Sequence, residues 1–269
     1  DGKILDKAST ATPETLEELL AWLDQRLSER DYRGIAMSVP GAVHQETGVI
    51  EGISAIPYIH GFSWYEALAH HKLPIHLEND ANCVGLSELL AHPEIENAAC
   101  VVIGTGIGGA MIINGKLHRG RHGLGGEFGY MTTIEPAERL NNWSQLASTG
   151  NMVRYVIEKS GQTDWDGRKV YQEAAAGNAL CQEAIERMNR NLAQGLLNIQ
   201  YLIDPDVISL GGSISQNPDF IKGVQKAVDA FVERYEEYTI APVIQACTYQ
   251  ADANLYGALV NWLQEENQW

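Results

Sequence analysis

Apolar residues recur along the chain at two spacings, one typical of amphipathic helices and one of buried strands. A stripe of leucines three or four positions apart predicts a helix that opens at Thr12-Pro13-Glu14, with a cap residue, proline at the first position and an acid near the positive helix end. The leucines of this stripe are Leu16, Leu19, Leu20, Leu23 and Leu27.

Short apolar runs that end in Gly, Pro or Asn-Asp predict strands, and longer periodic stretches predict helices. We expect strands at 34–39, 74–78, 98–103, 110–113, 207–210 and 243–246. We expect the remaining helices at 81–90, 150–159, 168–176, 179–203, 218–234 and 254–264.

Strands and helices alternate in both halves, so the sequence predicts an α/β protein. Each half carries an apolar strand followed by a glycine turn, which indicates two related lobes with a cleft between them. We place the smaller lobe at residues 1–100 and the larger at 101–269, and expect the final helix to pack back on the smaller lobe.

The first residues predict a hairpin turn at Asp1-Gly2-Lys3 that leads into a strand at Ile4-Leu5. A domain rarely begins inside a hairpin, so we expect further residues to precede Asp1.

Charge, cysteine content and hydropathy limit the classes of protein to which this chain can belong. The 269 residues carry a formal net charge of −16, which disfavours binding to nucleic acid and to anionic membranes. Cys83, Cys100, Cys181 and Cys247 lie far apart with no CxxC pair, which predicts reduced, buried thiols rather than a zinc site or a disulfide framework. No apolar run is long enough to span a membrane and no secretory signal is present, so we expect a cytoplasmic protein.

The stretch Val101 to Ala110 (VVIGTGIGGA) runs from an apolar strand through a glycine-rich turn into another apolar strand. Glycines let backbone N–H groups approach an anion and Thr105 adds a hydroxyl, so the turn can cradle phosphates. A plain tight hairpin would show the same pattern. A strand follows instead of a helix and no Gly-Lys-Ser/Thr is present, so neither a dinucleotide fingerprint nor a Walker loop fits.

Three further segments can carry chemistry. Gly211-Gly212-Ser213 follows a strand, where a flat ligand such as adenine can lie against the backbone, or where the chain simply turns. Asn79-Asp80 follows the strand at 74–78, so Asp80 is either a helix cap or a general base with Asn79 as a ligand-binding partner. In the glycine-dense segment 123–130, a flexible loop is the alternative to a site where Glu127 accepts hydrogen bonds from sugar hydroxyls.

Taken together and in this order, four segments resemble the ROK family of sugar kinases and repressors. They are ENDANC (Glu78 to Cys83), IGTGIGG (Ile103 to Gly109), GGEFGYM (Gly125 to Met131) and LGGSIS (Leu210 to Ser215). Each is weak alone, and the combination is specific. The resemblance covers the whole chain.

The resemblance implies a two-lobed actin-like ATPase fold, related to ribonuclease H, with a central cleft. It further implies a homodimer in which ATP with Mg²⁺ donates a phosphoryl group, usually to the 6-hydroxyl of a hexose. Asp80 is then expected to be the catalytic base. The sugar is expected to bind Ser54, Asn79, Asp80, Glu127 and Tyr130. The phosphates and adenosine are expected to bind Gly104, Thr105, Gly106, Gly108, Gly109, Gly211 and Gly212.

The sequence departs from the family pattern at three places. The opening phosphate loop, a strand followed by Asp-x-Gly-Gly-Thr, is absent and would lie just before Asp1. Tyr130 replaces the usual His, and 132–150 lacks the cysteines of a zinc loop, so no zinc is expected. A further glutamate is replaced near Ser144.

These departures and the chain's ending resemble the β-glucoside kinase branch, whose substrates are disaccharides such as cellobiose. Loss of the His and Glu would open the pocket for a second sugar unit. The alternatives are a glucokinase or N-acetylmannosamine kinase, a sugar-responsive repressor with a DNA-binding segment ahead of this region, and a catalytically inactive sugar-binding protein. The acidic charge argues against the repressor, and the intact Asp80 argues against the inactive protein.

Overall fold

The computed structural model describes residues 2–52, 54–134, 140–235 and 237–269. Its helices are α1 (Leu16–Leu27), α2 (Trp64–Ala67), α3 (Asp80–Ala91), α4 (Trp143–Ala147), α5 (Thr149–Ser160), α6 (Gly167–Ala175), α7 (Ala179–Ile203), α8 (Pro218–Arg234) and α9 (Ala253–Glu265). Its strands are β1 (Ile35–Val39), β2 (Ala42–His44), β3 (Val49–Glu51), β4 (Ile75–Asn79), β5 (Ala98–Ile103), β6 (Ile107–Ile113), β7 (Lys116–Leu117), β8 (Thr132–Ile134), β9 (Leu140–Asn142), β10 (Val207–Gly211) and β11 (Ile244–Ala246).

The first part of the chain is built on a parallel pair of strands, β1 and β4, in which Val39 lies opposite Asn79. The antiparallel pair β2–β3 lies beside it. The leucine stripe of α1 packs on the buried side chains of this region, among them Leu77 and Trp64. Burial of this apolar face is what holds α1, because an isolated helix of this length is marginal in water.

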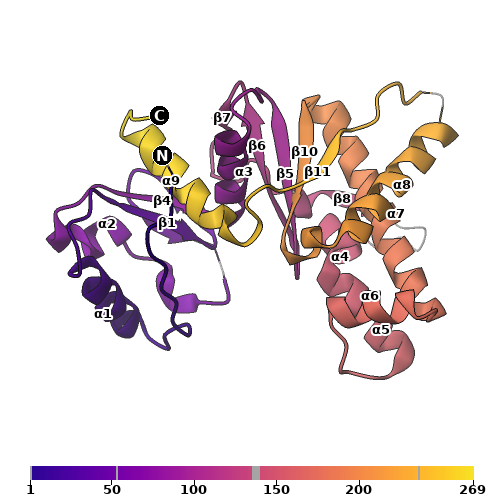
Figure 1. Ribbon diagram of the computed structural model, residues 1–269, viewed down its shortest axis with the longest axis horizontal. Helices are drawn as coiled ribbons and strands as arrows, with labels where there is room; N and C mark the ends of the chain where they lie inside the picture. The colour runs from indigo at the N-terminus through magenta and orange to yellow at the C-terminus, as the bar shows by residue number, and fades with distance from the viewer. Residues whose placement is uncertain (1, 53, 135–139, 236) are drawn as a thin grey trace.

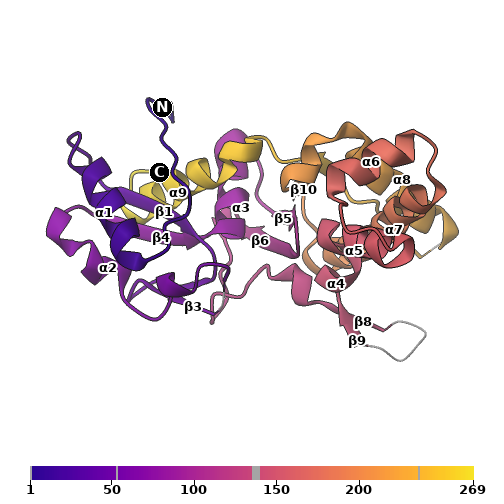
Figure 2. The same cartoon turned by 90° about the horizontal axis from the view of Figure 1, so that it is seen from below.

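The second part is organised by a five-stranded sheet with the order β11-β10-β5-β6-β7. β10 pairs in parallel with both β11 and β5, whereas β5, β6 and β7 form an antiparallel meander. In Figure 1 α3 lies on one side of this sheet and α7 and α8 lie on the other. Figure 2 shows β8 and β9 projecting from the same part of the molecule, beside α4.

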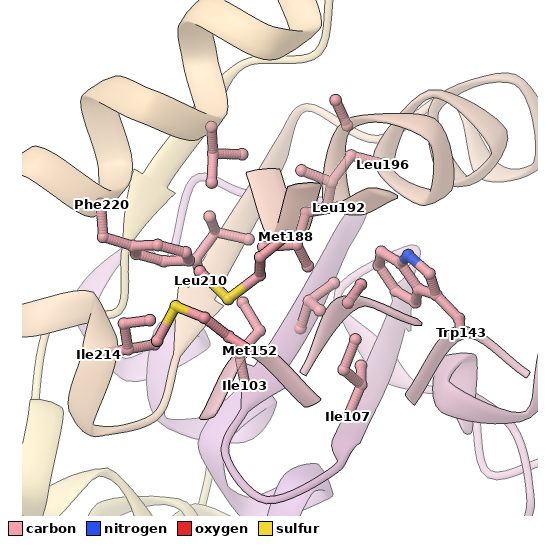
Figure 3. Packing of buried hydrophobic residues seen from close by; sticks show 14 of the residues in the cluster. Ile103, Ile107, Trp143, Met152, Met188, Leu192, Leu196, Leu210, Ile214 and Phe220 are labelled. Carbon is pink, nitrogen blue, oxygen red and sulfur yellow. The ribbon is translucent and has the colours of Figure 1, made fainter. Parts of the chain in front are cut away.

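The main hydrophobic core fills the space between the sheet and α4 to α8 (Figure 3). Trp143 is fully buried, and its indole N–H donates to the Asn191 carbonyl oxygen at 2.8 Å. Gly195 of α7 faces this ring, and any side chain at that position would collide with it. The tryptophan and the glycine therefore fix how α4 sits against α7.

The last helix returns to the first part of the chain. α9 packs against α3, β1 and β4, and Gly257 brings its backbone so close to Cys83 that a Cβ there would collide with the Cys83 carbonyl. The C-terminal end of the chain thereby lies next to the strand that leads into Asp80.

Two local expectations are wrong. The hairpin expected at Asp1-Gly2-Lys3 stays a prediction, because Asp1 lies outside the described residues. The cap of α1 is Thr15 rather than Thr12, because the Thr15 hydroxyl accepts from the Glu18 N–H. The strand expected at 110–113 begins at Ile107, because Gly108 and Gly109 pair with Val102 and Val101.

Candidate functional site

A cavity of about 470 Å³ opens where the N-terminus of α3 meets the two glycine-rich segments. Asp80 and Glu127 bring carboxylates to it, and Gly104, Gly106 and Gly108 bring exposed backbone. The other residues that line it are Ala81, Val84, Val102, Ile107, Gly129, Tyr130, Asn142, Ser144 and Asn254. The structure thus gathers residues from five separate stretches of sequence around one pocket.

Asp80 is the first residue of α3, and one of its carboxylate oxygens accepts from the Ala81 N–H at 2.8 Å. Burial raises the pKa of the Asp80 carboxyl, and hydrogen bonds from the Ala81 and Asp80 backbone and from Asn79 oppose that rise. A carboxylate with a raised pKa beside a cavity is well suited to accept a proton.

Asn79, not Asp80, is the N-cap of α3. Its Oδ1 accepts from the N–H groups of Ala81 and Asn82, at 2.9 and 3.1 Å, and its Nδ2 donates to the Gly41 carbonyl at 3.1 Å. The helix-cap alternative considered for Asp80 is therefore wrong, and the Asp80 side chain remains at the cavity. Asn79 is buried and does not line the cavity, so its expected role as a sugar ligand remains a prediction.

Glu127 lies just before the short 3-10 turn Phe128–Tyr130, and its carboxylate lines the cavity. Burial raises the pKa of Glu127, and the negative charge of Asp80 raises it further. The negative charge on Asp80 therefore acts on the Glu127 carboxylate at the same cavity. Tyr130 also lines it, with 71% of the residue exposed.

The turn between β5 and β6 offers backbone to the cavity. A Cβ added to Gly104 would meet no atom within 4 Å, whereas a Cβ on Gly109 would clash with Phe128. Gly104, Gly106 and Gly108 line the cavity, and Thr105 and Gly109 do not. The glycine at 109 is explained by packing alone, so its predicted phosphate contact has no geometric support here.

Gly211 is a buried residue of β10, and Gly212 follows it with a φ of +90°. A side chain on Gly212 would collide with the Ile103 carbonyl, so the Gly-Gly pair lets the chain pass close to the β5–β6 turn. Beyond it lies a second cavity, of about 600 Å³, lined by Thr149, Asp166, Gly167, Arg168, Tyr171, Ser213, Ile214, Gln216 and Asn217. Neither Gly211 nor Gly212 lines either of these two cavities.

Two hydroxyls in the second cavity have no hydrogen-bond partner among the described residues. They are Thr149 Oγ1 and Tyr171 OH, both buried. Burial, with a contribution from the charge of Asp219, raises the pKa of Tyr171 well above its usual range, so the hydroxyl stays protonated. Unpaired buried hydroxyls cost free energy unless a ligand or water satisfies them, and these two belong to residues that line the cavity.

Ser54 lines neither cavity. Its hydroxyl contacts His60 Nε2 at 2.8 Å and the Ile56 backbone, and its expected sugar contact remains a prediction. Asn142 and Asn254 line the first cavity but carried no signal in the sequence, because each reaches it only through tertiary packing. Ser144 also lines it, near the position where the sequence predicts that a family glutamate is replaced, and its hydroxyl bonds to the Ile107 backbone.

The chain belongs to the ROK family, whose profile matches residues 1–265. A β-glucoside kinase of Listeria monocytogenes is 34% identical over 98% of this chain and 91% of its own length. A β-glucoside kinase of Klebsiella pneumoniae is 30% identical over 98% of this chain and 90% of its own length.

Solved structures agree with this assignment. A ROK family protein from Streptococcus pneumoniae, in complex with sucrose, has 87% identity and a TM-score of 0.97, covering 99% of this chain and 92% of that one. A ROK family glucokinase from Streptomyces griseus, in complex with glucose and AMPPNP, has a TM-score of 0.75 at 24% identity, covering 96% of this chain and 91% of that one. The fold is the actin-like ATPase fold of ROK sugar kinases, as the sequence predicted.

No helix in the described part of the chain is both long and apolar enough to cross a membrane. Residues 135–139, within the segment where no zinc loop is expected, lie outside the described residues.

Proposed function

We propose that this protein is an ATP-dependent sugar kinase that phosphorylates a hexose or β-glucoside, with the 6-hydroxyl as acceptor. The observation that carries the proposal is that Asp80 and the open backbone of the β5–β6 turn line one cavity. A base for the acceptor hydroxyl and donors for a phosphate thereby meet at one place. The kinase names of the full-length relatives support the same reaction.

In this mechanism the sugar lies in the first cavity, where Glu127 accepts hydrogen bonds from its hydroxyls. The oxygen of the sugar hydroxyl attacks the γ-phosphorus of ATP, and Asp80 accepts the proton of that hydroxyl. The bond between the γ-phosphorus and the bridging oxygen of the β-phosphate breaks. ADP and the sugar phosphate are the products. The reaction needs little covalent help from the protein, so positioning and charge stabilisation supply most of the rate.

The nucleotide fits the second cavity and the β5–β6 turn. Gly104 leaves room for a phosphate against the backbone, and Thr149 and Tyr171, whose hydroxyls have no partner among the described residues, line the cavity that we assign to the nucleoside. Gly211 and Gly212 connect the two regions and let the chain run close to Ile103. Mg²⁺ enters with the triphosphate, and we assign it no protein ligand.

The acceptor we favour is a β-glucoside or another disaccharide. Tyr130 is mostly exposed and Ser144 is short, so the cavity has room beside the first sugar ring. The names of the Listeria and Klebsiella relatives and the sucrose complex of the Streptococcus pneumoniae protein point to substrates of this size. An aromatic ring at the mouth can stack on a second sugar unit.

We further propose that residues 1–100 and 101–269 form two lobes that close on the substrates, with α9 packed on the smaller lobe. Closure would exclude water from the phosphoryl group.

A homodimer is part of the proposal, and exposed apolar side chains near β11, among them Leu202, Ile240 and Val243, offer a surface for it. We place the reaction in the cytoplasm, where ATP is available.

The test is ADP release by the full-length protein with Mg-ATP and a panel of glucose, N-acetylmannosamine, fructose, cellobiose and gentiobiose. Turnover on the disaccharides is the expected result. Turnover on a monosaccharide alone would keep the kinase and remove the β-glucoside assignment. Absence of turnover on every sugar, with sugar binding retained in calorimetry, would contradict the kinase and favour a sugar-responsive repressor.

A further inference from the structure

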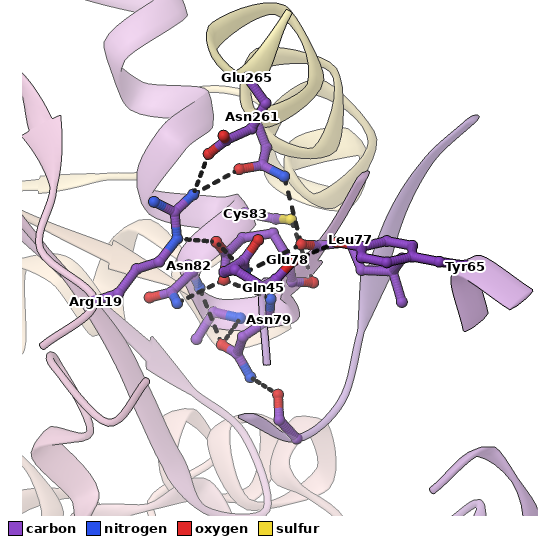
Figure 4. Close-up of polar contacts among 12 residues, drawn as sticks. Gln45, Tyr65, Leu77, Glu78, Asn79, Asn82, Cys83, Arg119, Asn261 and Glu265 are labelled. Carbon is purple, nitrogen blue, oxygen red and sulfur yellow. Dashed lines mark hydrogen bonds and ion pairs between the residues drawn. The ribbon is translucent and has the colours of Figure 1, made fainter. Parts of the chain in front are cut away.

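Glu78 is a buried carboxylate that no step above uses. It is the next-to-last residue of β4, two positions before Asp80, with 2% of its side chain exposed. Its Oε1 accepts from the Asn79 N–H at 2.7 Å and from Asn82 Nδ2 at 2.8 Å (Figure 4). These bonds tie Glu78 to the backbone of the residue before Asp80 and to the side chain of the residue two positions after it.

The remaining Glu78 oxygen is paired with Arg119, whose Nε donates to Oε2 at 2.6 Å. Arg119 follows β7, in the segment that leads to Glu127. Its own carbonyl oxygen accepts from the Gly125 N–H at 2.8 Å, two residues before Glu127. One residue therefore bonds through its side chain to the segment that carries Asp80, and through its backbone to the segment that carries Glu127.

The C-terminal helix completes the network. Arg119 Nη2 donates to Asn261 Oδ1 at 2.8 Å and lies 3.3 Å from a Glu265 carboxylate oxygen, both on α9. Asn261 is fully buried, and its Nδ2 donates to the Leu77 carbonyl at 3.4 Å, next to Glu78. Figure 4 shows the guanidinium between Glu78 and these two α9 side chains.

We propose that Arg119 and Glu78 are positioning residues that set the spacing of Asp80 and Glu127, with Asn261 of α9 fixing the guanidinium. The inference rests on the proposed kinase function. A buried ion pair contributes little net stability compared with apolar residues of similar volume, so its use here is geometric. The planar guanidinium suits this task, because its Nε and Nη2 donate to Glu78 and to α9 side chains in directions that the plane fixes.

The test compares Arg119→Met, Arg119→Lys and the double variant Glu78→Gln/Arg119→Met with the wild-type protein. For Arg119→Met we expect kcat/KM for the sugar to fall about 10-fold or more, since small misplacements of reacting groups cost up to about 10²-fold. KM for ATP should stay unchanged, because none of the network residues lines the second cavity. Arg119→Lys should recover part of the loss.

The double variant separates positioning from folding. It leaves no unpaired buried charge, so its Tm should return toward the wild-type value while kcat/KM for the sugar stays low. Recovery of both Tm and kcat/KM would overturn the proposal, as would wild-type kcat/KM in Arg119→Met.

Arg30→Met is the matched control, because it removes an arginine from an exposed pair with Asp6 that has the same 2.6 Å separation. It should leave kcat/KM unchanged. If the double variant does not fold, Arg119→Lys decides: wild-type kcat/KM with lysine, which cannot reproduce the planar fork, would overturn the proposal. Absence of sugar turnover by the wild-type protein contradicts the proposed function itself and is distinct from each of these results.

Discussion

The two glycine-rich segments of this protein look alike in sequence and need their glycines for different reasons. In the turn at 104–109, a Cβ on Gly104 would meet nothing within 4 Å, and one on Gly106 would only touch Ser144 at 3.6 Å. In the segment at 123–129, a Cβ on Gly126 would lie 2.8 Å from the Ala110 Cα, and one on Gly129 would collide with the Ile107 carbonyl.

In the first segment Gly104 and Gly106 leave room for a ligand, although Gly109 is needed for packing against Phe128, and in the second segment Gly126 and Gly129 let the chain pack on β6. The second still serves the site, because its close packing holds Glu127 at the cavity. A glycine motif in the sequence does not tell which glycines make room for a ligand and which allow close packing. The atoms around each Cα in the structure do tell.

Both segments face Asp80, so the largest effect we expect comes from that residue. Asp80→Asn should lower kcat by about 10²-fold or more, the loss typical for removal of a general base. Sugar binding measured by calorimetry should be retained, since the amide keeps the shape of the side chain. Unchanged turnover would remove Asp80 from the mechanism.

The variant Gly129→Ala tests whether the segment at 123–129 needs its glycines for close packing. The added methyl group would collide with the Ile107 carbonyl and with Ser144 Oγ, so we expect a loss of about 1–3 kcal/mol in the free energy of unfolding. Urea denaturation of the variant and of Gly104→Ala measures it. Equal stability of the two variants would contradict the distinction drawn between the segments.

Gly104→Ala also tests the ligand side of the comparison. Its stability should stay within about 0.5 kcal/mol of the wild-type value, because the methyl group enters open space. KM for ATP should rise roughly 10-fold, the equivalent of about 1.4 kcal/mol, since the methyl group occupies the approach of a phosphate. Unchanged KM for ATP would place the phosphates elsewhere.

The smallest effect concerns pH. Asp80 must be deprotonated to act as a base, and burial raises its pKa, so kcat/KM should fall as the pH drops through a value above that of an ordinary aspartic acid. The acid limb of a pH–rate profile measures this value. A midpoint at or below the ordinary aspartic acid value would show that Asp80 is not the titrating group.

The sequence predicted helices and strands well where apolar periodicity was uninterrupted. The bounds expected for 179–203 and 218–234 agree with α7 and α8, whose N-caps Asn178 and Asn217 accept helix N–H groups. Signals failed where two residues competed for one role. Thr15 displaced Thr12 as a cap, and Asn79 displaced Asp80, because backbone geometry decides which side chain reaches the free N–H groups.

The family and the fold were predicted from four motifs and are confirmed, because motif order along the chain is a property of the sequence itself. The sequence alone also singled out Asp80, Glu127 and Tyr130, which the structure brings to one cavity, although their roles remain predictions. It did not give Asn142 or Asn254, nor the pairing of Arg119 with Glu78, 41 positions apart. Periodicity and caps act between neighbours in sequence and can be read there, whereas a cavity and a buried ion pair exist only after distant segments pack together, so only the tertiary structure decides them.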